Sequence, residues 1–159
     1  MALTTAQLAT LKADILANPT LSSQPMNSDG HFFIAQYYNV TASPDFWVWR
    51  TNVPTKDCKT AMVWTEYIGR SAGEREAWQF MLSNGIINAA DVNVRQGIQD
   101  IFSGPSGLQS RTNLTNIARR LATRAETLLA TGTGSTASPA TMGFEGNLSF
   151  QDIELARNS

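Results

Sequence analysis

The sequence predicts an all-α fold: a helical bundle of about six to seven helices with a flexible linker and an extended C-terminal arm. In most segments apolar residues recur at spacings of three and four, as in Leu8, Leu11 and Ile15. Glycine and proline separate these segments at short intervals. No convincing run alternates apolar and polar residues as a half-buried strand does.

Capping residues and helix breakers place the first helices. Thr4–Ala17 is expected to be helical, with a threonine cap and a stop at Asn18-Pro19. A short buried helix rich in aromatic residues is expected over His31–Asn39. Ser43-Pro44-Asp45 predicts another helix start, because serine caps, proline suits the first helical position and aspartate meets the positive helix end. That helix would continue through Phe46–Arg50.

Four further helices follow the same logic. One is expected over Thr55–Gly69, and the next starts at a Ser71/Glu74 capping box and runs to Asn84-Gly85. A helix capped by Asn88 is expected to reach Phe102. The last, Arg111–Ala130, combines an apolar stripe with four arginines and one acid.

The C-terminal part differs from this predicted helical body of residues 1–130. Residues 131–143 are rich in Gly, Ser and Thr and read as a linker, which as a flexible chain would span about 20 Å. Residues 144–159 form the predicted docking arm, with a short helix over Phe150–Arg157. The arm could dock on its own body or on a neighbour. Its expected partner-binding anchors are Phe144, Leu148, Phe150, Ile153 and Leu155.

Composition excludes several classes of protein. Charged residues make up 16% of the chain, below the typical ~25%, and the net charge is −1, so the chain as a whole is not basic enough to indicate nucleic-acid binding. One cysteine, Cys58, leaves no intramolecular disulfide and no cysteine-based zinc site. No segment approaches the ~20 apolar residues of a membrane span, and the N-terminus lacks the pattern of a signal peptide.

Candidate chemistry is sparse. His31 is the sole histidine, and nothing in the sequence brings a nucleophile such as Cys58 to it. The acids Glu74 and Asp91 already have capping roles, so we expect no catalytic, cofactor or metal site and no enzyme. Arg119, Arg120 and Arg124 lie on one broad side of the predicted helix. They form either a solvated face or a contact with acids or DNA.

Two stretches carry a resemblance to a known group of proteins. The opening MALTTAQLATLKADILANP and the closing RAETLLATGTGSTASPATMGFEGNLSFQDIELARN, together with the middle, resemble small virion-structural proteins of tailed bacteriophages and prophages. Among these, head–tail connector (adaptor) proteins are similar in type: small helical bodies that form rings under the portal. In them a C-terminal arm reaches the portal or the next ring.

The resemblance implies a virion protein that is assembled in the host bacterial cytoplasm. Its expected partners are further copies of itself in a ring and the portal or other head and tail proteins, with non-specific contact to packaged DNA. No membrane and no small-molecule substrate is expected. The arm anchors and Arg119, Arg120 and Arg124 would bind the neighbour, so a chain without residues 144–159 should stay folded and monomeric. Alternatives are a tail terminator or completion protein, a capsid cement protein, or a small DNA- or host-protein-binding module.

Overall fold

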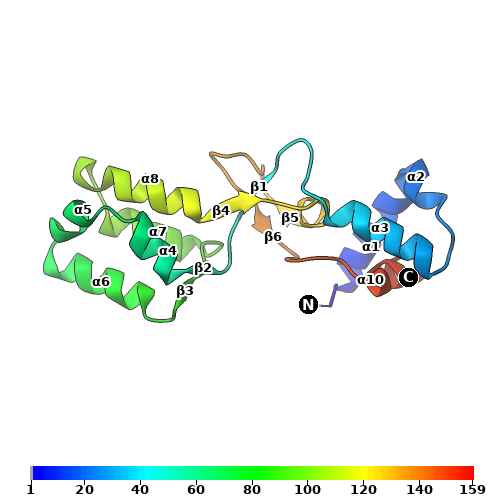
Figure 1. Cartoon of the computed structure of the whole chain (residues 1–159), viewed down its shortest axis with the longest axis horizontal. Helices are drawn as coiled ribbons and strands as arrows, with labels where there is room; N and C mark the ends of the chain where they lie inside the picture. Colours follow the sequence, from blue (N-terminus) through cyan, green and yellow to red (C-terminus); the bar gives the residue numbers. More distant parts are fainter. Residues whose placement is uncertain (1) are drawn as a thin grey trace. The chain divides into compact units, whose positions relative to one another are not determined.

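The computed structural model describes residues 2–159. Over this range it contains ten α-helices, one 3-10 turn and three two-stranded sheets, which pair β1 with β4, β2 with β3 and β5 with β6 (Figure 1). The fold is therefore mixed α/β, and the predicted all-α bundle of about six to seven helices with a flexible linker and extended arm is wrong. Each strand has only two or three residues, too few to leave an alternating pattern in the sequence.

The chain divides into two compact units. Unit 1 combines the segment up to Val48 with Leu121–Ser159, and unit 2 is Trp49–Arg120. This division differs from the predicted body of residues 1–130, linker of 131–143 and arm of 144–159. The difference arises because the C-terminal residues pack with the N-terminal helices.

Unit 1 contains five helices and one small sheet. The helices are α1 (Thr5–Ala17), α2 (Pro19–Ser22), α3 (Ser28–Asn39), α9 (Arg124–Leu128) and α10 (Phe150–Asn158). The first predicted helix is confirmed, and Thr4 caps it in a capping box with Gln7. The predicted helix at His31 starts three residues earlier, because the Asn27 side chain accepts a hydrogen bond from Gly30 N and caps it there.

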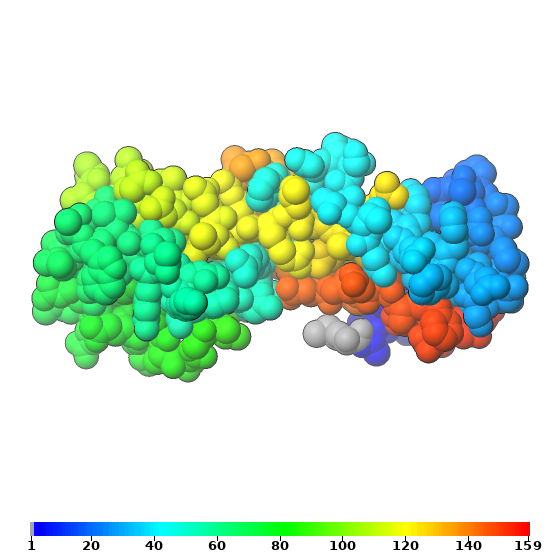
Figure 2. Space-filling view, in the orientation of Figure 1, coloured from blue at the N-terminus to red at the C-terminus, as the bar shows by residue number. Residues whose placement is uncertain are grey.

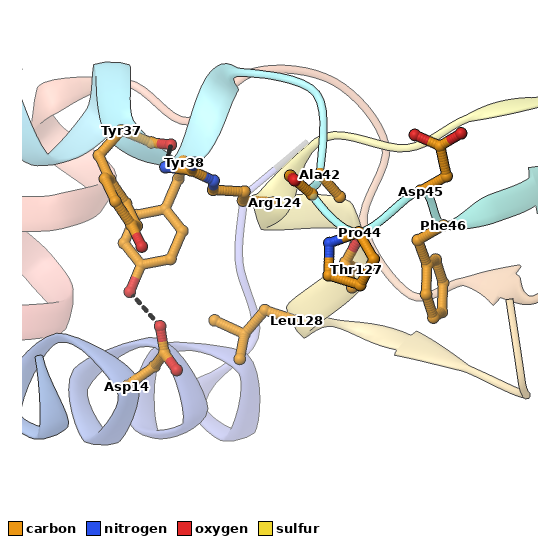
Figure 3. A pocket seen from close by; sticks show the side chains of 11 residues that line it. Asp14, Tyr37, Tyr38, Ala42, Pro44, Asp45, Phe46, Arg124, Thr127 and Leu128 are labelled. Carbon is orange, nitrogen blue, oxygen red and sulfur yellow. Dashed lines mark hydrogen bonds between the residues drawn. The ribbon is translucent and has the colours of Figure 1, made fainter.

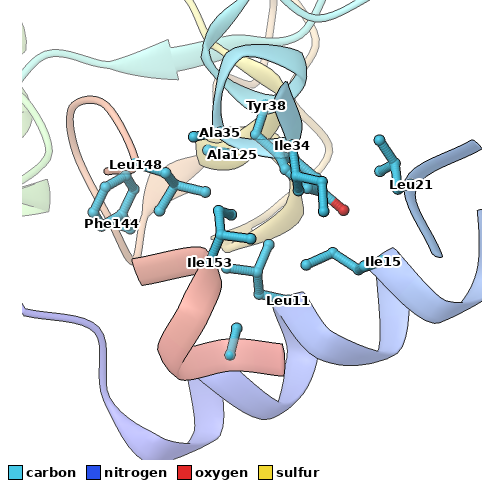
Figure 4. Close-up of a cluster of buried hydrophobic side chains, with 11 residues drawn as sticks. Leu11, Ile15, Leu21, Ile34, Ala35, Tyr38, Ala125, Phe144, Leu148 and Ile153 are labelled. Carbon is cyan, nitrogen blue, oxygen red and sulfur yellow. The ribbon is translucent and has the colours of Figure 1, made fainter. Parts of the chain in front are cut away.

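The core of unit 1 joins the two ends of the chain. Helix α10 lies beside α1 and α3, and the space-filling view shows C-terminal residues packed against N-terminal ones (Figures 1 and 2). Figure 4 shows the buried cluster between them. Its members are Leu11, Ile15, Leu21, Ile34, Ala35, Tyr38, Ala125, Phe144, Leu148, Ile153 and Ala156.

The residues predicted as a linker fold onto unit 1. β5 (Ala130–Thr131) and β6 (Thr141–Met142) pair antiparallel, and Ala140 N donates to Trp47 O at 2.9 Å. Trp47 N in turn donates to Gly134 O at 2.7 Å. Gly134 has a φ of +67°, and a Cβ there would lie 2.2 Å from the Phe46 ring. This close approach requires glycine and fixes the segment in place.

Unit 2 consists mainly of helices: α4 (Thr55–Ala61), α5 (Trp64–Ile68), α6 (Ala72–Leu82), α7 (Val92–Ile101) and α8 (Leu108–Ile117). β2 (Val53–Pro54) pairs with β3 (Ile86–Ile87), and the 3-10 turn is Pro105–Gly107. The predicted Ser71 capping box is confirmed at α6, whereas α7 is capped by Asp91 and not by Asn88. The core is the buried cluster of Val53, Cys58, Met62, Trp78, Ile87, Ala89, Ile98, Ile101, Phe102, Leu114 and Ala118.

Two predicted helices of the middle segment are wrong in detail. Trp47–Trp49 forms strand β1 instead of a helix, which agrees with the strand preference of aromatic and β-branched residues. The helix predicted over Thr55–Gly69 breaks at Met62-Val63 into α4 and α5. Side chains of α8 replace the missing helical partners: Ser110 Oγ accepts from Val63 N at 3.0 Å, and Asn113 Nδ2 donates to Ala61 O at 2.9 Å.

The arginine-rich helix predicted over Arg111–Ala130 is also wrong. The chain leaves α8 after Ile117, forms β4 (Arg119–Leu121) and starts α9 at a new capping box of Thr123 and Glu126. The extended backbone gains long-range partners, since Ala118 O accepts from Arg50 N and Ala122 N donates to Phe46 O. These bonds satisfy polar groups that a helix would have paired locally.

Burial of the C-terminal segment predicts a clear difference between two neighbouring substitutions. Ile153 is 0% exposed and Leu155 is 58% exposed on the same helix. Ile153→Ala should lower the free energy of unfolding by about 2–5 kcal/mol, because it removes core packing and leaves a cavity. Leu155→Ala, the matched control, should change it by less than about 0.5 kcal/mol. Urea denaturation followed by circular dichroism measures both, and equal effects would contradict this packing.

Glu66 predicts a pH dependence of unit 2. Its carboxylate accepts hydrogen bonds from Ser110 N at 2.7 Å and Gln109 N at 3.2 Å, tying α5 to the start of α8. Hydrogen bonds from Ser110, first from its side chain, hold the pKa of Glu66 below its ordinary value of 4.5. The contribution to stability is thus complete above pH 4.5 and is lost as the pH falls through the lower folded-state pKa.

The measurement is the urea midpoint between about pH 3 and pH 6. Glu66→Gln should flatten the acid side of this profile. Glu76→Gln, a matched control on the exposed side of α6, should leave the slope as in the wild type. If the urea midpoint of Glu66→Gln fell with pH as steeply as that of the wild type, Glu66 would not contribute to the acid dependence of stability.

Candidate partner-binding sites

The predicted arm anchors divide into buried and exposed residues. Phe144, Leu148 and Ile153 are buried in the core of unit 1. Phe150 is 37% exposed and Leu155 is 58% exposed, so these two anchors remain accessible on α10. The structure thus shows docking in cis for the buried anchors, and binding of a neighbour by the exposed ones stays a prediction.

Polar contacts hold the same segment on unit 1. Asn39 makes two hydrogen bonds with the backbone of Leu148, accepting from its N at 2.8 Å and donating to its O at 2.9 Å. Gln7 Nε2 donates to Gly143 O at 2.7 Å, and Arg157 donates to the carbonyls of Gln24 and Pro25. These bonds satisfy backbone groups that no strand or helix pairs.

The three predicted arginines lie on different elements. Arg119 and Arg120 belong to β4, while Arg124 is the first residue of α9. Arg119 Nη2 donates to Asn116 Oδ1 at 2.6 Å within unit 2. The single cationic helix face expected from the sequence is therefore not formed, and contact of these residues with acids or DNA stays a prediction.

Arg124 instead lines a pocket within unit 1 (Figure 3). The cavity has a volume of about 330 Å³. Its lining comes from α1, α3, the loop before β1, and α9: Asp14, Tyr37, Tyr38, Ala42, Ser43, Pro44, Asp45, Phe46, Arg124, Thr127 and Leu128. Sequence reasoning singled out Arg124 but not this pocket, because its walls come from four separate segments.

Two interactions define the polar end of the Arg124 pocket. The Arg124 guanidinium lies 4.2 Å from the centroid of the Tyr37 ring, a cation–π contact. Tyr38 Oη donates to Asp14 Oδ2 at 2.5 Å. Burial, followed by the hydrogen bond to Asp14, raises the pKa of Tyr38 well above its ordinary value, so the hydroxyl remains a donor.

Unit 2 carries an exposed apolar surface around the end of α6 and strand β3. Phe80 is 78% exposed, Ile86 52% and Val92 64%. A groove of about 500 Å³ in the same region is lined by Phe80, Met81, Asn84, Ile86, Ile87, Asn88 and Val94. We call Phe80, Ile86 and this groove the α6–β3 surface. Contiguous exposed apolar side chains are a feature of interaction sites, which makes this surface a candidate.

Phe80 is the signal in the sequence for the α6–β3 surface. Trp78 faces the core of unit 2, so Phe80, two positions further on, falls on another side of the helix. A large aromatic residue away from the core stripe of an amphipathic helix indicates a second packing surface.

Cys58 and His31, the candidate catalytic residues of the sequence, are both buried. Cys58 is 2% exposed in the core of unit 2, and His31 is buried in unit 1, where its Nε2 has no hydrogen-bond partner among residues 2–159. Across the same range no three or more His, Cys, Asp or Glu side chains cluster as a metal site would require. Of the helices described, none is both long and apolar enough to span a bilayer.

The chain matches no family model, no curated protein and no solved structure.

Burial makes Cys58 a testable marker of the folded state of unit 2. Burial, and then the nearby Asp57, raises the pKa of the thiol from 9.0 to about 11, which reduces the thiolate fraction about a hundredfold. Alkylation by iodoacetamide at pH 8 should accordingly be at least about a hundredfold slower in the native chain than in urea. Mass spectrometry of timed samples measures this rate, and native labelling as fast as in urea would contradict the buried position.

Proposed function

We propose that this chain is a structural subunit of a tailed-phage particle, of the head–tail connector type, which assembles as a ring next to the portal. The observation that carries the assembly step is the α6–β3 surface of unit 2, with Phe80 and Ile86 exposed at an apolar groove that they line. The resemblance of the opening and closing stretches to virion-structural proteins supports the particle role. The low charged content also suits a subunit, since few ions need desolvation at a contact.

In this proposal the α6–β3 surface, and not the C-terminal arm, makes the main contact with a neighbouring copy. The arm anchors Phe144, Leu148 and Ile153 already fill the core of their own chain. Releasing them would expose that core and cost several kcal/mol. A free apolar surface needs no such release, and its burial contributes about 25 cal/mol per Å².

Native mass spectrometry of the full chain tests the assembly. We expect a closed ring of about twelve copies for a connector. Phe80→Ser with Ile86→Ser should reduce it to a monomer with an unchanged circular dichroism spectrum. Phe32→Ser with Leu16→Ser, which replaces two exposed apolar residues of unit 1 outside the predicted anchors, is the matched control and should leave the ring intact.

Other outcomes separate the alternatives. A ring of about six copies would favour a tail terminator, and about three copies a capsid cement protein. A wild-type chain that stays monomeric at about 100 µM would overturn self-assembly through the α6–β3 surface. Retention on DNA that falls steeply with salt and is lost in Arg119→Ala with Arg120→Ala would favour a DNA-binding module.

A further inference from the structure

We propose that the Arg124 pocket of unit 1 binds a carboxylate carried on an apolar body, as an acidic side chain beside an apolar side chain of a partner protein presents it. The proposal joins a positioned guanidinium to a mainly apolar cavity of about 330 Å³ (Figure 3). It does not depend on ring assembly or on the α6–β3 surface.

The guanidinium is held in place but has donors left over. Arg124 N donates to Val40 O at 3.0 Å, and the side chain is stacked on the Tyr37 ring. Arg124 Nη1 lies 3.4 Å from Tyr37 O, a long hydrogen bond. The Arg124 side chain has no other hydrogen-bond partner among residues 2–159. A planar fork fixed from one side and free on the other fits a carboxylate, which accepts two parallel hydrogen bonds.

The charges of the lining decide which anion fits. Arg124 is accompanied by two carboxylates, Asp14 and Asp45. Asp14 already accepts the Tyr38 hydroxyl, and Asp45 lies at the opposite end of the group of side chains (Figure 3). Arg124 and the two acids give the lining a net charge of −1, so a doubly charged phosphate is repelled more strongly than a single carboxylate, which can pair with Arg124.

The remaining walls require an apolar body on the ligand. Pro44, Phe46 and Leu128 form the apolar part of the cavity. The loop that carries the first two is fixed by backbone bonds, with Ala42 N donating to Ala122 O at 2.9 Å and Ala122 N donating to Phe46 O at 2.8 Å. Because the walls are in place before binding, little conformational entropy is lost on association.

Binding is tested by NMR titration of the ¹⁵N-labelled full chain. The probes are acetyl-Glu-Phe-amide, its uncharged counterpart acetyl-Gln-Phe-amide, 3-phenylpropionate and inorganic phosphate. We expect saturable shifts of the amides of Phe46, Arg124 and Thr127 with the Glu peptide. The Gln peptide should bind at least about tenfold more weakly, because it lacks the charge-assisted pair with Arg124.

Four variants locate the site. Arg124→Gln should abolish the difference between the Glu and Gln peptides, and Arg124→Lys should restore only part of it, because lysine lacks the planar fork. Thr127→Phe, which keeps Arg124 in the sequence, should block both peptides by filling the cavity. Asp45→Asn should tighten binding of the Glu peptide, since it removes a negative charge from the lining.

Four results would overturn the proposal. One is an absence of saturable shifts with either carboxylate probe in the folded wild-type chain. Another is equal binding by Arg124→Gln and the wild type, or equal shifts with phosphate and the Glu peptide. Binding of 3-phenylpropionate without the peptide would assign the pocket to a free small carboxylate and exclude the partner side chain.

Discussion

The packing of the C-terminal segment against α1 and α3 is the interaction on which unit 1 depends. Unit 1 is built from two stretches of chain separated by the whole of unit 2, so neither stretch holds a complete core. Ile153 and Ala156 of α10 fill the space beside Leu11 and Ile15 of α1. Closing so long a loop costs conformational entropy that grows only slowly with its length, and burial of this cluster offsets it.

Polar groups at the same junction add specificity to the packing. Glu126 is almost fully buried, and its carboxylate accepts from Thr123 N at 2.9 Å and from Gly146 N at 3.0 Å. One side chain thus caps α9 locally and anchors a residue of the returning C-terminal segment. A buried carboxylate is tolerated only where donors surround it, so this pairing favours one register of the segment over others.

Local signals in the sequence were enough to predict helix starts but not chain paths. A threonine cap at Thr4 and the capping box at Ser71 start α1 and α6 as expected, because the partners of both caps lie three residues away. The break at Met62-Val63 depends on Ser110 and Asn113, and no local pattern shows such distant partners. Likewise the pattern of Leu121 and Leu128 fits a helix, yet Thr123 and Glu126 interrupt it with a second capping box. That box was visible in the sequence.

Local sequence patterns could not locate the two candidate sites either, because residues from separate segments form them. The sequence pointed to Arg124 and to apolar anchors in the arm, whereas the side chain with the larger exposure is Phe80 of unit 2, at 78% against 58% for Leu155. An apolar surface supplies binding energy without fixing orientation, while a single guanidinium in a shaped pocket discriminates between ligands and adds less energy. The two surfaces of this chain differ in the same way: the α6–β3 surface of unit 2 is apolar, and the Arg124 pocket of unit 1 holds one guanidinium beside apolar walls.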